Sequence, residues 1–173
     1  MEENFSHIQL PNFVLANWFK HHLIEEEVTS TIAKNSNTNT SISFLGNNKK
    51  NIILIVNELE GVFISDKNLT LIEKLLAACK LTLADVAILN IAKTKINYKD
   101  FKQQLQPQIL ILMGIDPTTI QLPLVFPMHK IQPYDSCKML ITTSIDRMQK
   151  TNDPKVLEEK KELWGLLKTL FNL

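Results

Sequence analysis

Short apolar runs alternate along the chain with longer segments in which apolar residues recur at helical spacing. The run Ile52–Val56 is wholly apolar and rich in β-branched residues, which is typical of a strand buried on both faces of a parallel sheet. Over residues 68–79 the apolar positions recur every three or four residues, which predicts an amphipathic helix. A second apolar run covers 86–89. Strand, helix and strand in this order predict a right-handed βαβ unit at the centre of the fold.

The rest of the pattern extends this unit. It predicts, in order, a helix over 98–105, a strand over 109–113, a brief helix from Pro117, a strand over 138–142 and a last helix from Pro154. Residues 42–45 favour a short edge strand, and residues 124–126 a short extended run between prolines. Together these elements predict a three-layer α/β domain with a mostly parallel sheet of four or five strands and three to four helices.

Three regions differ in composition. Residues 1–34 form an N-terminal segment with large apolar side chains, residues 35–48 are almost wholly polar and predict a loop, and residues 49–173 predict a single α/β domain. The full length of 173 residues is enough for one domain with a real core and short for two.

The N-terminal segment has two interpretations. Its large side chains are suited either to a first helix packed on the domain or to a peptide that binds a partner protein, and they include Leu10, Phe13, Trp18 and Phe19. The adjacent pair His21-His22 does not predict a metal site, because neighbouring residues of a helix point about 100° apart.

Composition narrows the classes of function. The net charge is +1, so no overall field favours nucleic acid or an anionic membrane. Two cysteines exclude a multi-bridge disulfide framework, and Cys79 falls on an apolar helix face, where a buried thiol is expected. The sequence has neither the features of a signal peptide nor a run of about 20 apolar residues. We therefore expect a cytoplasmic protein without contact to membranes.

The loop that follows the first core strand carries candidate chemistry. In parallel α/β folds the carboxyl ends of the strands are the usual place for a site, and here the loop includes Asn57, Glu58, Glu60 and Gly61. Two carboxylates can act as general acid and base. The alternative is a solvated loop that leads into the next helix, with Asp66 or Asn68 as its cap.

The order of these elements resembles the uracil-DNA glycosylase superfamily. The segments that carry the resemblance are Ile52–Gly61, Val86–Lys93, Pro107–Gly114 and Ile141–Pro154 with Trp164. They stand where those enzymes have a strand leading into a Gly-Glu-Ala-Pro-Gly loop, a strand ending in Asn and a basic residue, a Pro-led strand ending in Gly, and a His-Pro-Ser loop before a last helix. The resemblance implies the glycosylase fold over about residues 50 to 172.

The catalytic loops of that superfamily are degenerate in this chain. Only Glu58 and Gly61 fit the first loop, and Thr142 replaces the histidine that would stabilise the departing uracil anion, followed by Thr143 and Ser144. A threonine donates one hydrogen bond but supplies no cation. The cluster cysteines of the iron–sulfur branch are absent from the sequence. We therefore expect no enzymatic activity, no cofactor and no bound metal.

A non-catalytic branch of the same superfamily is more similar. The psi-subunit family of DNA polymerase III has an apolar N-terminal peptide containing Trp, similar to Leu10–His22 here, and a first strand that enters an amphipathic helix, similar to Ile53–Leu76. This resemblance implies a replication adaptor in which Leu10, Phe13, Trp18 and Phe19 bind the clamp loader. A second face would bind another replisome protein, and contact with nucleic acid would be indirect.

Two other hypotheses stay open on the sequence. One is a divergent glycosylase or other base-handling enzyme in which Glu58 or Glu60 acts as the base. The other is an α/β interaction domain unrelated to DNA. A uracil-release assay and substitution of Trp18 distinguish them.

Overall fold

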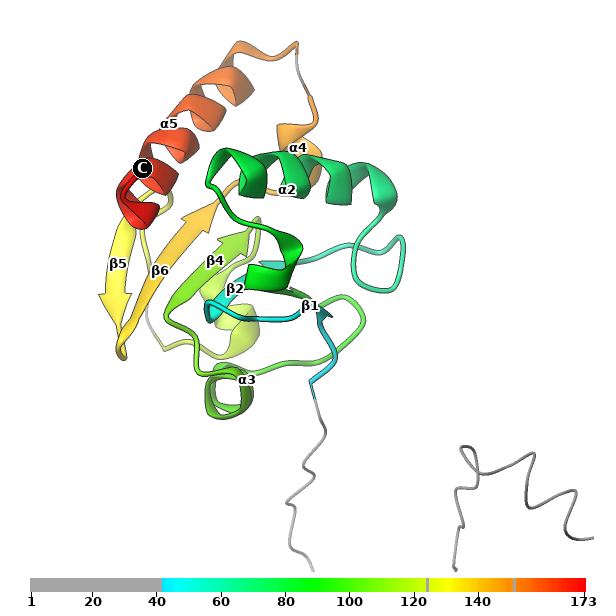
Figure 1. The fold of residues 1–173 in the computed structure, drawn as a ribbon, viewed down its shortest axis with the longest axis vertical. Helices are drawn as coiled ribbons and strands as arrows, with labels where there is room; N and C mark the ends of the chain where they lie inside the picture. Colours follow the sequence, from blue (N-terminus) through cyan, green and yellow to red (C-terminus); the bar gives the residue numbers. More distant parts are fainter. Residues whose placement is uncertain (1–41, 124, 151) are drawn as a thin grey trace, which may run out of the picture. The chain divides into compact units, whose positions relative to one another are not determined.

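The computed structural model describes residues 42–123, 125–150 and 152–173. The strands are β1 (Leu45–Gly46), β2 (Ile52–Val56), β3 (Val86–Asn90), β4 (Ile109–Met113), β5 (Ile131–Tyr134) and β6 (Cys137–Thr142). The helices are α2 (Asp66–Ala78), α3 (Tyr98–Leu105), α4 (Ile145–Met148) and α5 (Pro154–Phe171), with the 3-10 turns η1 (Leu83–Asp85) and η2 (Pro117–Ile120). Figure 1 shows this α/β arrangement.

The sheet is mixed rather than mostly parallel, and it has six strands rather than four or five. Its strand order is β1-β3-β2-β4-β6-β5. The four inner strands pair in parallel, as the βαβ pattern predicts, whereas β1 and β5 pair antiparallel at the two edges. The prediction was wrong at the edges because edge strands need only one partner and so carry a weaker apolar pattern.

Strand β5 is the clearest element that the sequence pattern missed. It forms a hairpin with β6 through Asp135 and Ser136, whose φ angles of 51° and 64° fit a two-residue turn that matches the twist of antiparallel strands. Pro133 lies inside β5 and opposes Lys138. A proline inside a strand is tolerated at a sheet edge, where the missing N–H faces no neighbouring strand.

The central elements lie where the sequence pattern predicts them. The runs at 52–56, 86–90 and 109–113 are β2, β3 and β4, and every residue of β2 and β3 is buried. The predicted helix over 98–105 is α3, and the helix predicted over 68–79 is α2, which begins two residues earlier and ends one residue earlier. Edge strand β1 shares only Leu45 with the predicted run 42–45 and extends to Gly46, inside residues 35–48 that were predicted as a polar loop.

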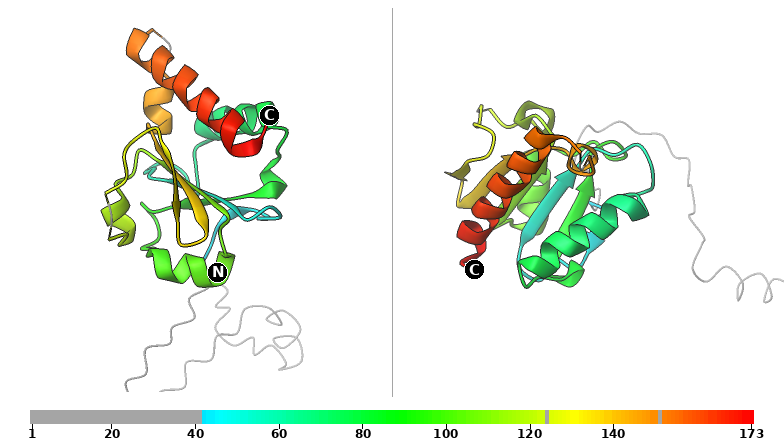
Figure 2. Two further views of the ribbon diagram at one scale, coloured as in Figure 1. Left: turned by 90° about the vertical axis from the view of Figure 1, so that its left-hand side faces the viewer. Right: turned by 90° about the horizontal axis from the view of Figure 1, so that it is seen from above.

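Helices cover both faces of the sheet, because alternate strand residues point to opposite sides. On one face, side chains of β2 pack against α2 and α5 through Ile72 and Leu167. On the other face, Phe101 of α3 and Ile120 of η2 cover the sheet. Figure 2 shows α2 and α5 side by side over the first of these faces. Cys79 belongs to the same face and is 4% exposed, which confirms the prediction that its thiol is buried.

Helix ends follow capping chemistry with one correction. Asp153 accepts a hydrogen bond from Lys155 N–H at the start of α5, and Asn97 caps α3, where it accepts from Asp100 N–H. Neither Asp66 nor Asn68 caps α2, because the N-cap residue is Ser65. The backbone N–H of Ser65 donates instead to the side chain of Glu58 in the preceding loop.

Some predictions concern other parts of the chain. Leu10, Phe13, Trp18 and Phe19 lie outside the described residues. Within the described residues, no helix combines the length and the apolar character that are needed to cross a membrane. The short helix α4 was not predicted, since it spans Ile145–Met148 only and carries no helical repeat of its own.

Candidate functional site

The predicted loop residues lie at the carboxyl edge of the sheet, where Glu58 is held by Asn90. Asn90 is the last residue of β3, and its side chain binds both backbone groups of Glu58: Oδ1 accepts from Glu58 N–H at 3.1 Å, and Nδ2 donates to the Glu58 carbonyl at 2.8 Å. Both residues are buried. This contact fixes the first step of the β2–α2 loop against the neighbouring strand.

The carboxylate of Glu58 also has a structural partner. Its Oε1 accepts from the backbone N–H of Ser65 at 3.1 Å, at the start of α2. A negative charge is favourable there, because the first N–H groups of a helix are unpaired and the helix dipole is positive at this end. Glu58 is only 8% exposed, and within the described residues its Oε2 has no hydrogen-bond partner. Glu58 therefore serves first to close the loop onto α2.

The other predicted residues of this loop do not join Glu58. Asn57 and Glu60 are exposed. Gly61 has a φ of 76°, and a Cβ atom on it would lie 2.8 Å from the carbonyl oxygen of Ile64, so the loop requires glycine here. Lys93 reaches across from the loop after β3 and donates to the carbonyl of Leu59 at 2.8 Å.

The predicted threonines and serine lie at the end of β6. Thr142 is fully buried, and among the described residues its hydroxyl has no hydrogen-bond partner. Ser144 is the N-cap of α4 and accepts from Arg147 N–H at 3.4 Å. Strand β4 separates β6 from β2 in the sheet, so Thr142 at the end of β6 and Glu58 in the loop after β2 belong to strands that are not neighbours. The two predicted loops thus share an edge of the sheet, and each makes its own contacts.

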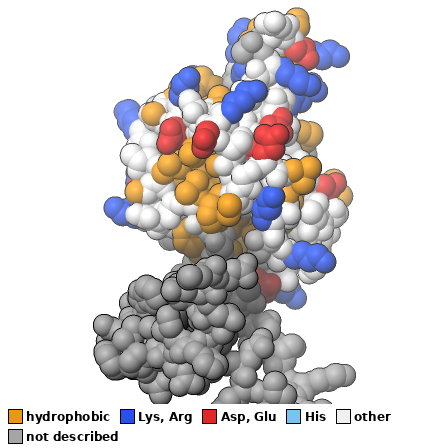
Figure 3. All heavy atoms as spheres, turned by 90° about the vertical axis from the view of Figure 1, so that its right-hand side faces the viewer, with side chains coloured by type: hydrophobic (Ala, Val, Ile, Leu, Met, Phe, Trp, Pro, Cys, Tyr) orange, Lys and Arg blue, Asp and Glu red, His pale blue; other side chains and the backbone are white. Residues whose placement is uncertain are grey.

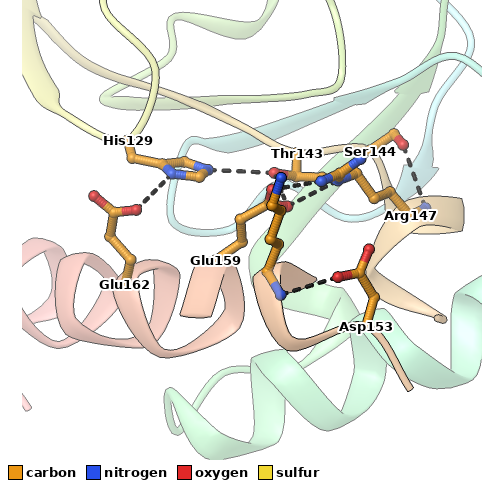
Figure 4. Close-up of polar contacts among 8 residues, drawn as sticks. His129, Thr143, Ser144, Arg147, Asp153, Glu159 and Glu162 are labelled. Carbon is orange, nitrogen blue, oxygen red and sulfur yellow. Dashed lines mark hydrogen bonds and ion pairs between the residues drawn. The ribbon is translucent and has the colours of Figure 1, made fainter. Parts of the chain in front are cut away.

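Thr143 belongs to a network that sequence reasoning missed. We call His129, Thr143, Arg147, Glu159 and Glu162 the carboxyl-edge network (Figure 4). The imidazole Nδ1 lies 2.7 Å from Glu162 Oε2, and Nε2 lies 3.3 Å from the Thr143 hydroxyl oxygen. That hydroxyl donates to Glu159 Oε2 at 2.9 Å, and Arg147 donates to both carboxylate oxygens of Glu159 at 3.0 and 2.9 Å. The network joins α5 to α4 and to the end of β6.

Hydrogen positions in the network follow from its acceptors. Ionised carboxylates only accept, so Nδ1 of His129 must carry the hydrogen that faces Glu162. Thr143 has one hydroxyl hydrogen, and it is directed to Glu159. The imidazole therefore lies between the Glu162 carboxylate and the Thr143 hydroxyl.

Charge pairing sets the electrostatics of this network. The hydrogen bonds from the Arg147 guanidinium, followed by the one from the Thr143 hydroxyl, hold the pKa of Glu159 below its ordinary value. The same contact with Glu159 raises the pKa of Arg147. Both groups therefore stay charged across the neutral range, and Glu159 and Arg147 form a bidentate ion pair.

The order hydroxyl, imidazole, carboxylate is also found in nucleophilic enzymes, but here the hydroxyl is not placed for attack. Thr143 is 5% exposed, and its hydrogen is directed to Glu159 rather than to the imidazole. Within the described residues, no group of three or more His, Cys, Asp and Glu side chains is placed to hold a metal ion. The arrangement fits the fixing of α5 better than it fits catalysis.

One sequence signal pointed toward the network. Glu159 and Glu162 are three residues apart on α5, so they share a helix face. Their partner His129 lies in a proline-rich loop, where a lone histidine is expected at the surface. Nothing local in the sequence indicates that His129 meets Glu162.

Exposed apolar side chains lie on the same loop as Glu58. Leu59 is 81% exposed and Val62 is 72% exposed. This loop lies to the right of α2 in Figure 1. Figure 3 shows that side of the molecule, where hydrophobic side chains gather in the middle with acidic side chains beside them. Exposed apolar groups of this kind are common where a protein contacts another protein.

The comparison with known proteins assigns the chain to no family. No protein-family model matches the chain, and no curated protein matches it.

Proposed function

We propose that this chain is a non-enzymatic adaptor of the DNA replication machinery, similar to the psi subunit of DNA polymerase III. In this role it links the clamp loader to another replisome protein. We also propose that its α/β domain has the three-layer arrangement of the uracil-DNA glycosylase superfamily. The placement of α2 and α5 on one face of the sheet and α3 on the other supports that arrangement.

The observation that carries the proposal is that three of the glycosylase-like residues, Asn90, Glu58 and Thr143, make their contacts within the protein itself. Asn90 binds the backbone of Glu58, Glu58 binds the start of α2, and Thr143 binds Glu159. A base-excising site needs such groups free to contact a flipped base and its departing anion. Groups that are already paired inside the fold support a scaffold rather than an active site.

Exposed Leu59 and Val62 give the proposal a second line of support. An adaptor needs at least two contact surfaces, and apolar side chains at the surface favour protein contact. The resemblance of Leu10–His22 to a clamp-loader-binding peptide supplies the identity of the first partner.

The test is capture of the clamp loader from an extract of the native cell, with the full chain as bait. We expect clamp-loader subunits to be retained and identified by mass spectrometry. Trp18→Ala removes a candidate hot-spot side chain and is expected to weaken the purified interaction about 30-fold or more. Asn17→Ala changes the preceding residue without removing an aromatic group and is the matched control.

A uracil-release assay separates the enzymatic alternative. The adaptor predicts no uracil released from DNA above a protein-free control. Release that disappears in Glu58→Gln would establish the divergent glycosylase instead. An α/β interaction domain unrelated to DNA is supported if the full chain retains no replication protein and releases no uracil.

A further inference from the structure

A lysine-rimmed hollow opens at the amino ends of β2 and β4, at the opposite edge of the sheet from the carboxyl-edge network. We use this name for the cavity of about 600 Å³ bounded by Lys49, Lys50 and Lys80, with Ile52 and Phe171 among the apolar residues of its floor. All three lysines are exposed. They come from two places in the chain, since Lys49 and Lys50 precede β2 and Lys80 follows α2.

The floor of the hollow continues into an apolar cleft between α2 and α5. Ile52, Cys79 and Phe171 line both the hollow and a smaller cavity of about 30 Å³. The walls of the smaller cavity are apolar and include Leu75 of α2 and Leu167 of α5. Figure 2, seen from above, shows strands of the sheet between these two helices. A hollow with positive charge at its rim therefore leads directly to an apolar recess.

The size of the recess limits what can enter it. A cavity of about 30 Å³ has room for a small apolar group and is far below the several hundred Å³ of a small-molecule pocket. The tip of one aliphatic side chain fits this description. A nucleobase or a long acyl chain does not fit without separation of the two helices.

The charges of the rim are only partly neutralised within the protein. Asp85 lies 4.0 Å from Lys50, and hydrogen bonds from Thr82 help to keep this carboxylate ionised by lowering its pKa. Among the described residues, Lys49 and Lys80 form no ion pair. Flexible lysine ammonium groups are point charges that pair readily with mobile carboxylates. The free charge at the rim therefore favours an acidic partner.

We propose that the lysine-rimmed hollow binds an acidic peptide segment of a partner protein. One aliphatic side chain of that segment enters the recess between α2 and α5, and its neighbouring carboxylates pair with Lys49 and Lys80. This inference rests on the adaptor function proposed above, because it assigns the second of the two contact surfaces that an adaptor needs.

The test is fluorescence anisotropy with the full chain and a labelled peptide of six residues, five glutamates and one leucine at the third position. We expect saturable binding that weakens as salt is raised. Lys49→Glu combined with Lys80→Glu is expected to weaken binding at least tenfold. Lys99→Glu combined with Lys155→Glu makes the same change of charge at exposed positions away from the hollow and is expected to leave binding unchanged. Lys50 is kept because it pairs with Asp85.

One change in the peptide and one substitution in the protein test the apolar recess separately from the lysines. A peptide with glycine in place of leucine is expected to bind at least fivefold more weakly. Leu75→Phe adds volume at the half-buried wall of the recess and is expected to remove this preference for leucine while circular dichroism stays unchanged. If Leu75→Phe does not fold, the leucine-to-glycine comparison on the unchanged chain still decides the point.

Several results would overturn the inference. These are no binding of the peptide up to about 1 mM, equal binding by the two double variants, and equal binding of the leucine and glycine peptides. Tighter, lysine-dependent binding of a labelled thymidine oligonucleotide would assign the hollow to nucleic acid instead. Failure here is distinct from failure of the adaptor proposal: clamp-loader capture depends on Trp18, and the Trp18→Ala variant is expected to bind the peptide normally.

Discussion

Asn90 ends β3, Glu58 lies two residues after the end of the neighbouring strand β2, and the side-chain amide of Asn90 binds both the backbone N–H and the carbonyl of Glu58. The distances are 3.1 Å to the N–H and 2.8 Å to the carbonyl of Glu58. The same Asn90 oxygen accepts from Ala92 N–H at 3.1 Å. The ladder between β2 and β3 ends at the pair Val56 and Asn90, so the amide holds the loop two residues beyond the end of the ladder.

Replacement of Asn90 by leucine is expected to destabilise the protein by about 2 to 4 kcal/mol. Leucine has a similar size but leaves buried N–H and carbonyl groups of Glu58 without partners. Urea unfolding measures the change. Asn57→Ala, at an exposed neighbouring position, is the control and is expected to change stability by less than about 0.5 kcal/mol. A loss of stability below about 1 kcal/mol in Asn90→Leu would contradict the structural role of the Asn90 side chain.

Gly165→Ala is expected to stabilise the protein by about 0.5 to 1 kcal/mol. Gly165 lies inside α5, and a Cβ atom added there meets no other atom within 4 Å. Alanine lowers the conformational entropy of the unfolded chain and favours the helix. Thermal unfolding is expected to show a rise in Tm of about 1 to 4 °C. A fall in Tm would show that this face of α5 is covered.

The opposite result is expected for Gly114→Ala. Gly114 has a φ of 68°, and an added Cβ atom would lie 2.4 Å from Cβ of Ser144. Left-handed strain and overpacking together are expected to cost about 2 kcal/mol or more. Since Gly165→Ala is the same chemical change, it is the matched control in the same unfolding experiment. Equal stability of the two variants would be inconsistent with the close approach of Gly114 to Ser144.

The contribution of Glu159 to the free energy of unfolding is expected to depend on pH. A carboxylate whose pKa is lower in the folded than in the unfolded state adds stability above its unfolded pKa, and this contribution is lost as pH falls through the folded pKa. Hydrogen bonds from Arg147 give Glu159 such a lowered pKa. The difference in unfolding free energy between the unchanged chain and Glu159→Gln should therefore be constant near neutrality and shrink below about pH 4.

The control for this experiment is Glu158→Gln, which removes the same charge from the next, exposed residue. It is expected to change stability at neutral pH by less than about 0.5 kcal/mol. Chemical unfolding at a series of pH values measures both variants. A Glu159→Gln difference that grows as the pH falls would have the wrong sign for the ion pair with Arg147.

The thiol of Cys137 is expected to be inert in the folded protein. It is 2% exposed, and burial raises its pKa to about 12, so little thiolate forms near neutrality. Treatment with iodoacetamide at about pH 8, followed by mass spectrometry, should leave Cys137 unmodified in the native chain and modify it in concentrated guanidinium chloride. Equal labelling in both conditions would show that the strand carrying Cys137 opens readily.

Elements with a strong local pattern were the ones that the sequence predicted. Strands β2, β3 and β4 are continuous apolar runs, and α3 begins and ends at the predicted residues. Strand β5 was missed because its burial is partial and Pro133 interrupts it. Strand β1 has only two residues, and its position is set by pairing with β3 rather than by its own composition.

The candidate site was predicted residue by residue but not as an arrangement. The sequence singled out Glu58 and Thr143, and it gave no means to see that Asn90 binds one and Glu159 the other. These partners come from different elements of the fold, so their meeting depends on strand order and helix packing. A local pattern carries no information on such contacts.

The central position of β2 has a consequence for synthesis of the chain. β2 pairs with β3 and β4, and both of these strands follow it in the sequence. A nascent chain therefore leaves at least one edge of this wholly apolar strand open until the ribosome has added Met113. Unpaired apolar strands are prone to aggregate. Lys49 and Lys50, directly before β2, place positive charge beside this strand during the interval, and charged residues in such flanking positions oppose aggregation.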